Sequence, residues 1–380
     1  MAGYIFAIGA HNEKEVRDII SKSASQGIYS PRVMLNNTHP LAFEGTFCDF
    51  LSMKAGDNVY FFAKRKVYGI GKLANVGKDC KYCNYKKASN LEAYTYEKIQ
   101  DDLLVDYGKE SPDYRWICCF KSDPCFFETG IDIDEILTYK PERFKVLRTF
   151  WNLSFIKIDE EENDTLKEVI LLKHQKEMMA RKELFAFDDG YQKTIQTRIS
   201  DDYKLDVKSL LASAVEKGKV KHEMALEAAT IDALGKESTL TSLLGPWDYI
   251  SHQVAASPCK PVAYMDHIDV FAMRYLPGST IVGKYLVVEL KKGKAEKKDI
   301  DQIMKYTDWV CHEYAFGNYE AISSCLIASA FPPDISSYSS KVATRYYTSG
   351  SHPVENKGWH DMHLLRYRWE KGNITYDSFA

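Results

Sequence analysis

The sequence predicts an α/β protein (α+β overall) with a barrel-like N-terminal domain, a helical connector and a C-terminal mixed-sheet domain. Short apolar strands and tight turns dominate residues 1–165. Charged residues are dense and turn residues few over 166–220, which is typical of helices. From 221 to 380 the expected order is α-β-β-α-β, the order of a mixed α/β domain.

Alternating apolar residues define the elements of the N-terminal domain. The expected strands are Tyr4–Ile8, Asn58–Phe62, Val67–Leu73, Arg115–Phe120 and Phe144–Leu147. Over 44–75, apolar strands alternate with tight turns, as in a small and strongly curved sheet. The start, MAGYIFAIGAHNEKEV, lacks a basic region and its apolar run ends at His11, so it predicts a first strand rather than a signal peptide.

The connector and the C-terminal domain differ in their periodicity. We expect the helical connector to break near Asp188-Asp189-Gly190. The C-terminal domain is expected to contain helices at 221–234 and 299–314 and strands at 262–274, 284–291, 322–330 and 342–348.

Composition narrows the class of protein. The 380 residues suffice for two or three domains, and 50 basic against 53 acidic residues give a net charge of −3. This balance excludes a disordered chain and a uniformly basic nucleic-acid coat, but it allows a local basic groove. No stretch approaches the ~20 apolar residues of a membrane helix. Nine cysteines in a long chain favour reduced thiols and a cytoplasmic location.

The clearest chemical pattern lies at 266–310. Asp269 sits in one apolar strand, and Glu289 and Lys291 leave another, where their spacing of two puts them on one face. Such charges are costly to bury unless they are paired or bound to metal. The carboxylates of Asp269 and Glu289, with the carbonyl of Leu290, make a hard oxygen site suited to Mg²⁺. Lys291 would orient a water or neutralise developing charge; a solvated Glu-Lys pair is the alternative.

A helix with an apolar face follows the second strand. Gln302 and Tyr306 are four residues apart, so they share a face of this helix. The set is therefore a strand Asp, an E-x-K that begins 289 − 269 = 20 residues later, and Q-x-x-x-Y on the next helix.

This set resembles the PD-(D/E)XK nuclease superfamily, in particular its RecB-type and mismatch-endonuclease-type branches, over roughly 220–350. The resemblance implies metal ligation by Asp269 and Glu289, with Mg²⁺ or Mn²⁺ as the ion. It implies that Lys291 is the catalytic lysine and that Gln302 and Tyr306 support the site or touch DNA. The second motif departs from the usual Pro-Asp or Gly-x-x-Asp, since His267-Ile268 precedes the acid.

The superfamily also commonly places an acid on the helix before the sheet. Glu223 and Glu227 are the candidates, and Glu227 is preferred because it shares a stripe with Ile231 and Leu234. A solvated helix face is the alternative. Residues 284–298 carry six lysines and two glutamates, a local charge of 6 − 2 = +4 that would attract a phosphate backbone or form an ordinary solvated loop.

Residues 55–73, AGDNVYFFAKRKVYGIGKL, resemble PUA-like domains, in particular their EVE and ASCH relatives. The resemblance implies a pocket for a flipped, often modified base, which needs an aromatic wall and polar groups. Trp116 and Tyr60 are the predicted base-binding residues. Further candidates are Phe62, Tyr68, Asn36, Asn37 and Asp49. Packing in the core is the alternative for each aromatic residue.

These patterns predict a Mg²⁺-dependent DNA endonuclease whose N-terminal domain selects the target, in restriction or phage defence. The alternatives are a nuclease for RNA or for mismatched or branched DNA, and a binding protein that uses the nuclease fold as a scaffold. A homodimer is expected, because two copies would supply one site for each DNA strand. Apolar residues of the connector such as Leu171 and Met178 would pack against the second copy or within the chain.

Overall fold

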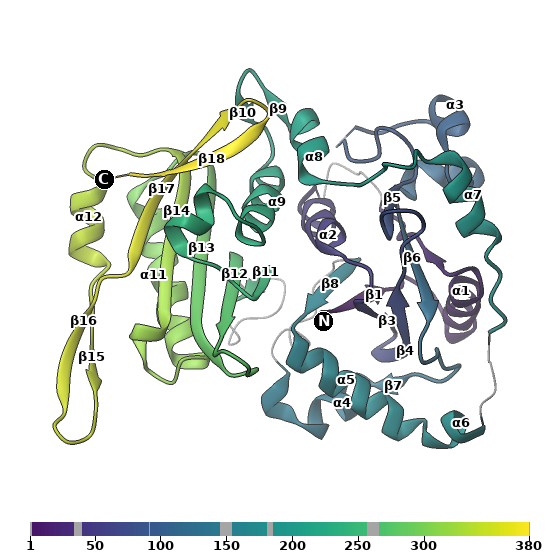
Figure 1. Cartoon of the computed structure of the whole chain (residues 1–380), viewed down its shortest axis with the longest axis horizontal. Coiled ribbons are helices and arrows are strands. Elements are labelled where there is room, and N and C mark those ends of the chain that lie inside the picture. The colour runs from purple at the N-terminus through teal and green to yellow at the C-terminus, as the bar shows by residue number, and fades with distance from the viewer. Residues whose placement is uncertain are drawn as a thin grey trace. The chain divides into compact units, whose positions relative to one another are not determined.

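The computed structural model describes residues 2–33, 40–90, 92–144, 154–180, 185–256 and 266–379. The chain forms two compact units, Met1–Asp206 and Val207–Ala380, each with its own sheets and helices (Figure 1). The predicted mixture of helices and strands is confirmed. None of the described helices is both long enough and apolar enough to cross a membrane.

The first unit is built on an eight-stranded sheet. Its strands are β1 (Gly3–Ala7), β2 (Ile28–Tyr29), β3 (Asn58–Ala63), β4 (Lys66–Leu73), β5 (Lys81–Cys83), β6 (Trp116–Ser122), β7 (Ile131–Asp132) and β8 (Phe155–Ile158). The main path is β2-β6-β4-β3-β1-β8, with β5 paired to β6 and β7 to β4. Only β1 and β3 pair in parallel among these strands. The path is open between β2 and β8 in the described structure, so the PUA-like barrel stays a prediction.

Helices pack around this sheet. They are α1 (Glu13–Gln26), α2 (Pro40–Ser52), α3 (Tyr96–Ile99), α4 (Ile133–Tyr139), α5 (Glu160–Lys173), α6 (Gln175–Ala180) and α7 (Gly190–Arg198). The Asn12 side chain accepts the Glu15 N–H and so begins α1, and Gly27, with φ 62°, ends it. The expected break near 188–190 is the start of α7. The last three residues of the strand expected at 144–147 lie outside the described residues.

Tight packing explains the G-I-G-K sequence of β4. A Cβ on Gly71 would come within 2.6 Å of the Phe126 ring and 2.8 Å of Val59. Only glycine leaves room for that ring over the strand. The motif is therefore accounted for by the core.

The second unit contains a six-stranded sheet in the order β11-β12-β13-β14-β17-β18. Its strands are β11 (Tyr249–Ala255), β12 (His267–Tyr275), β13 (Val282–Lys294), β14 (Ile322–Ala330), β17 (Met362–Glu370) and β18 (Asn373–Ser378). The neighbours β13, β14 and β17 run parallel, and the other pairs are antiparallel. Two hairpins complete the strands: β9 (Val215–Glu216) with β10 (Lys219–Val220), and β15 (Arg345–Ser349) with β16 (Glu355–Trp359).

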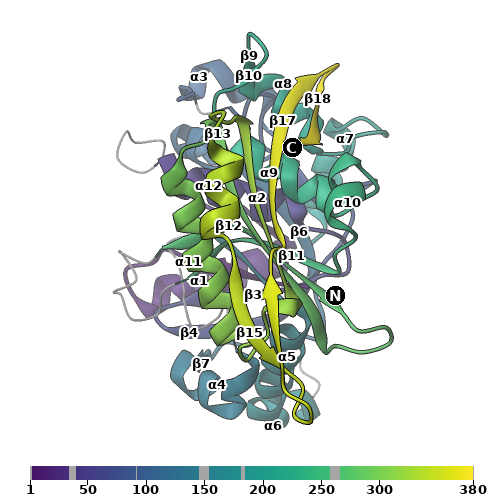
Figure 2. The same cartoon turned by 90° about the vertical axis from the view of Figure 1, so that its left-hand side faces the viewer.

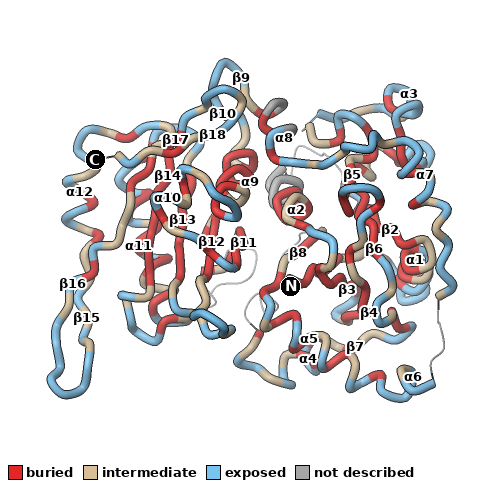
Figure 3. Tube along the Cα trace, in the orientation of Figure 1, coloured by how far each residue is buried: buried red, intermediate tan, exposed pale blue. Residues whose placement is uncertain are grey.

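Helices cover both faces of this sheet. The second unit has α8 (Val207–Ala214), α9 (Glu223–Leu234), α10 (Thr239–Leu244), α11 (Lys297–Glu313) and α12 (Ile335–Val342). Figure 2 shows α11 and α12 on one side of the sheet and α9 and α10 on the other. The central strand β14 is buried over most of its length, and β13 is buried from Tyr285 to Leu290 (Figure 3). Ile303 and Val310 of α11 pack with Val287 of β13 in one core cluster.

Candidate active site

The acidic residues of β12 and β13 face each other. Val270 pairs with Val288 in the antiparallel ladder, so the next position places Asp269 opposite Glu289. Opposite residues in such a ladder have Cβ atoms about 4.5–5.5 Å apart on one face. The sheet therefore brings together the two carboxylates that the sequence predicted as metal ligands.

Lys291 lies on the same face of β13. Its Nζ is 2.5 Å from Oε1 of Glu289. The Glu289 residue is only 1% exposed, and its second oxygen, Oε2, has no hydrogen-bond partner among the described residues. A buried carboxylate oxygen without a partner is costly unless a cation or a donor completes it.

Asp269 is held by the neighbouring strand and by an amide. Its Oδ2 accepts the backbone N–H of Leu290 at 2.7 Å, and its Oδ1 is 3.5 Å from Nε2 of Gln253. Leu290 thus offers its N–H to Asp269; coordination by its carbonyl oxygen stays a prediction.

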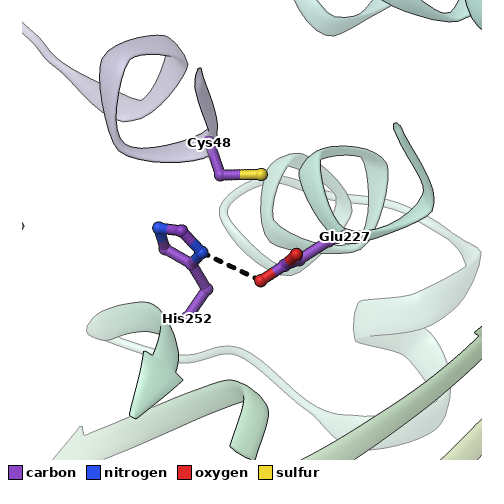
Figure 4. A group of neighbouring side chains, drawn as sticks. All are labelled: Cys48, Glu227 and His252. Carbon is purple, nitrogen blue, oxygen red and sulfur yellow. Dashed lines mark hydrogen bonds and ion pairs between the residues drawn. The ribbon is translucent and has the colours of Figure 1, made fainter. Parts of the chain in front are cut away.

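Glu227 reaches this group from α9. Its Oε1 lies 2.8 Å from Nδ1 of His252 (Figure 4). The same oxygen accepts a hydrogen bond from Nε2 of Gln253 at 3.2 Å. The same Gln253 amide therefore lies between Glu227 and Asp269. Glu227 is 5% exposed, so the solvated helix face considered from the sequence is wrong for this residue.

The Q-x-x-x-Y pair of α11 also lies near the acids. Nε2 of Gln302 donates to the Tyr306 hydroxyl at 2.7 Å. Burial, together with the charges of Glu289 and Asp269, raises the pKa of Tyr306 to about 12, although the hydrogen bond with Gln302 opposes the shift. Gln302 and Tyr306 therefore share a face of α11, as their spacing predicted.

Burial sets the electrostatics of the group. It is the largest factor that raises the pKa of Asp269, followed by the charges of Glu289 and Glu227. It also raises the pKa of Glu289, although Lys291 opposes the shift. For Lys291, burial lowers the pKa, but the charge and hydrogen bond of Glu289 outweigh it and the net pKa is raised.

The donor set fits a hard divalent cation. Asp269, Glu289 and Glu227 supply carboxylate oxygens, and Oε2 of Glu289 has no other partner in the described structure. Carboxylates are the ligands that Mg²⁺ and Mn²⁺ prefer. A bound cation would also offset the charges of Glu289 and Glu227, which add to burial in raising the pKa of Asp269.

Sequence analysis missed Gln253 and His252. Both lie in β11, where the polar pair interrupts YISHQVA and was the available signal. Gln253 has φ 51°, in the left-handed region that residues other than glycine rarely adopt. Such strain persists where surrounding contacts over-determine it, often at functional sites.

The predicted base-binding residues lie in the core of the first unit. Trp116 stacks on Phe47 and Phe50 with ring centroids 5.0 and 5.6 Å apart, and it has no exposed surface. Tyr60 is equally buried, and its hydroxyl donates to Oδ1 of Asn163 at 2.8 Å. This is the core packing that was the alternative for both residues; base stacking stays a prediction that would need the packing to open.

The described residues among the further base-pocket candidates also make contacts within the first unit. Tyr68 is buried, and Phe62 packs against the core cluster that contains Tyr60. Oδ2 of Asp49 accepts the backbone N–H of Lys157 at 3.2 Å, so it holds α2 to β8. Asn36 and Asn37 lie outside the described residues.

Comparisons with known proteins leave the family open. The chain matches no protein family and no curated protein. Among solved structures, it is similar to a hypothetical protein from Leishmania major, with 15% identity and a TM-score of 0.29 over 47% of this chain and 97% of that chain. It is also similar to a repair endonuclease from Pyrococcus abyssi, with 20% identity and a TM-score of 0.22 over 34% of this chain and 47% of that chain. At these scores we rest functional conclusions on the chain's own residues.

Proposed function

We propose that this protein is a metal-dependent endonuclease that hydrolyses phosphodiester bonds in DNA. One observation carries the proposal. Asp269 and Glu289 face each other on adjacent strands, Lys291 contacts Glu289 at 2.5 Å, and one buried Glu289 oxygen has no partner in the described structure. Two carboxylates can hold a divalent ion that activates a water and stabilises phosphate charge, and a lysine on the same face can stabilise the negative charge that develops.

Each residue has a role that follows from its position. Asp269 and Glu289 would hold Mg²⁺ or Mn²⁺, with Glu227 as a further acid. When bound, the ion supplies activation of a water and neutralisation of phosphate charge. Lys291, whose ammonium group stays charged beside Glu289, would stabilise negative charge that develops on the phosphate. Tyr306 would fix the position of the site from α11.

The choice of target is assigned to the N-terminal domain, residues 1–165 as predicted, followed by a connector at 166–220 and the nuclease domain at 221–380. The support is the resemblance of 55–73 to PUA-like domains, which implies recognition of a modified or flipped base. Restriction or phage defence in the cytoplasm would follow from such recognition. A homodimer would supply two sites for the two strands.

Plasmid cleavage tests the chemistry. Wild type is incubated with Mg²⁺ and a panel of plain and base-modified plasmids, beside Glu289→Ala and the control Glu313→Ala. Glu313 is an exposed acid in the last turn of α11. We expect Glu289→Ala to lower the cleavage rate by about a thousandfold or more and to lose Mn²⁺ affinity by calorimetry, while the control cleaves normally.

Two results would contradict the proposal. In the first, Glu289→Ala retains wild-type cleavage and metal affinity, and Glu289 and Lys291 then form only a structural ion pair. Alternatively, wild type would leave every DNA intact while cutting RNA of the same sequence, which would replace DNA by RNA as the substrate.

A further inference from the structure

A hairpin with a lysine-rich turn precedes α9. Its strands β9 and β10 are joined by Lys217 and Gly218, with φ values of 50° and 74°. Positive φ at both central residues is typical of a type I′ turn, whose twist matches that of the flanking strands. The exposed side chains of Lys217 and Lys219 are therefore carried on a defined backbone.

Two hydrogen bonds join this hairpin segment to the end of β13. Nζ of Lys292 donates to the backbone carbonyl of Lys221 at 3.3 Å. The backbone N–H of Lys292 donates to Oε2 of Glu223 at 3.4 Å. Because Lys292 directly follows Lys291, the hairpin is fixed beside the strand that carries the proposed catalytic residues.

Four exposed lysines at this end of the second unit form what we call the lysine surface. They are Lys217, Lys219, Lys292 and Lys294. Within the part of the chain that the structure describes, none of the four has a carboxylate oxygen within 4.0 Å. Unpaired cations on one surface project their field into solvent and attract polyanions.

Two other lysines near this surface do form ion pairs with carboxylates. Lys221 pairs with Glu216 at 2.7 Å, and Lys298 pairs with Glu296 at 2.7 Å. The members of the lysine surface differ from them in lacking a carboxylate at this distance. The carboxylates of the site would repel a phosphate backbone, and the lysine surface offsets that repulsion from the adjacent position.

We propose that the lysine surface binds the phosphate backbone of duplex DNA next to the bond to be cleaved. The inference rests on the proposed function, since it names how that site would hold its substrate. Each lysine that neutralises a phosphate releases condensed counterions, so its contribution is readable from the salt dependence of binding.

The test is a salt titration of binding by the full chain. Fluorescence anisotropy of a 30-base-pair DNA is measured in EDTA from about 50 to 200 mM salt, the range over which phosphate contacts are distinguished. Lys217→Ala/Lys219→Ala is compared with wild type and with the control Lys341→Ala/Lys357→Ala. Lys341 lies in the last turn of α12, whose first turn is the end near β13. Lys357 lies on β16, which leads into the start of β17, away from the end of β13.

We expect the hairpin variant to reduce the slope of log K against log salt by about 1.8, from two lost phosphate contacts at about 0.9 each, and to weaken binding at least about tenfold. The control should keep the wild-type slope. A hairpin variant with the wild-type slope, or a control that loses as much, would overturn the inference, and so would a slope change seen with duplex RNA alone.

Failure of the two proposals can be told apart. Binding in EDTA involves no cleavage, so a changed slope together with full cleavage by Glu289→Ala would reject the proposed site and keep the lysine surface. An unchanged slope in the hairpin variant together with loss of cleavage in Glu289→Ala would keep the proposed site and reject the lysine surface. Both hairpin lysines are exposed, so their removal leaves the fold intact by circular dichroism.

Discussion

Replacing Trp116 by alanine distinguishes a core residue from a base-binding one. The indole has no exposed surface and packs against Phe47 and Phe50, whose ring centroids lie 5.0 and 5.6 Å from its own. Removing a fully buried Trp costs about 3–5 kcal/mol of unfolding free energy, because transfer and cavity terms add. With a urea m-value of about 2 kcal/mol per M, a loss of about 4 kcal/mol lowers the midpoint by about 2 M.

The assay is urea unfolding followed by circular dichroism, in parallel with DNA binding. In Trp116→Ala the urea midpoint for unfolding of the first unit should fall, whereas the midpoint for the second unit should not change. Tyr346→Ala is the control, because this aromatic residue of β15 is 79% exposed and its loss should change stability by less than about 0.5 kcal/mol. If Trp116→Ala unfolds at the wild-type midpoint but loses about 1–3 kcal/mol of DNA affinity, the ring stacks on a base and our assignment to the core is wrong.

Three further predictions concern the second unit. Lys291→Ala should keep metal affinity by calorimetry but cleave about a hundredfold or more slowly, and wild-type cleavage would refute its role. EDTA should abolish cleavage and Mn²⁺ should restore it; cleavage in EDTA would exclude the proposed metal. Burial would raise the pKa of Asp361, but hydrogen bonds from His363, Ser323 and Lys284 outweigh it and hold this pKa well below its usual range. The ionised Asp361 carboxylate therefore contributes its full stabilisation above the unfolded pKa near 4, and this contribution declines as the pH falls from there through the folded-state pKa. Asp361→Asn should destabilise the protein more at pH 7 than at pH 3 in thermal unfolding.

Patterns of period 2 and 3.6 predicted the elements that carry the chemistry. The helix expected at 221–234 is Glu223–Leu234, and the strand expected at 322–330 is Ile322–Ala330. The convergence of Asp269 and Glu289 was predictable, because alternation along two neighbouring strands fixes which side chains share a face.

Other features depend on tertiary contacts that leave little trace in sequence. Strand β17, with the sequence MHLLRYRWE, was missed although its second half alternates apolar and charged residues; what the sequence does not show is its place between β14 and β18. The left-handed backbone of Gln253 is imposed by its surroundings and not by its own residue type. An aromatic residue in a strand, such as Trp116, has the same local sequence whether it lines a pocket or fills a core.

The hydrogen bond from the Leu290 amide to Oδ2 of Asp269 makes the site observable by a probe that needs no substrate. A proton shared with a carboxylate shifts its resonance when that carboxylate changes charge or takes a cation. The Leu290 amide would therefore act as a built-in reporter in nuclear magnetic resonance spectra. Because this bond also ties β12 to β13, its solvent exchange would record how far ion binding tightens that edge of the sheet.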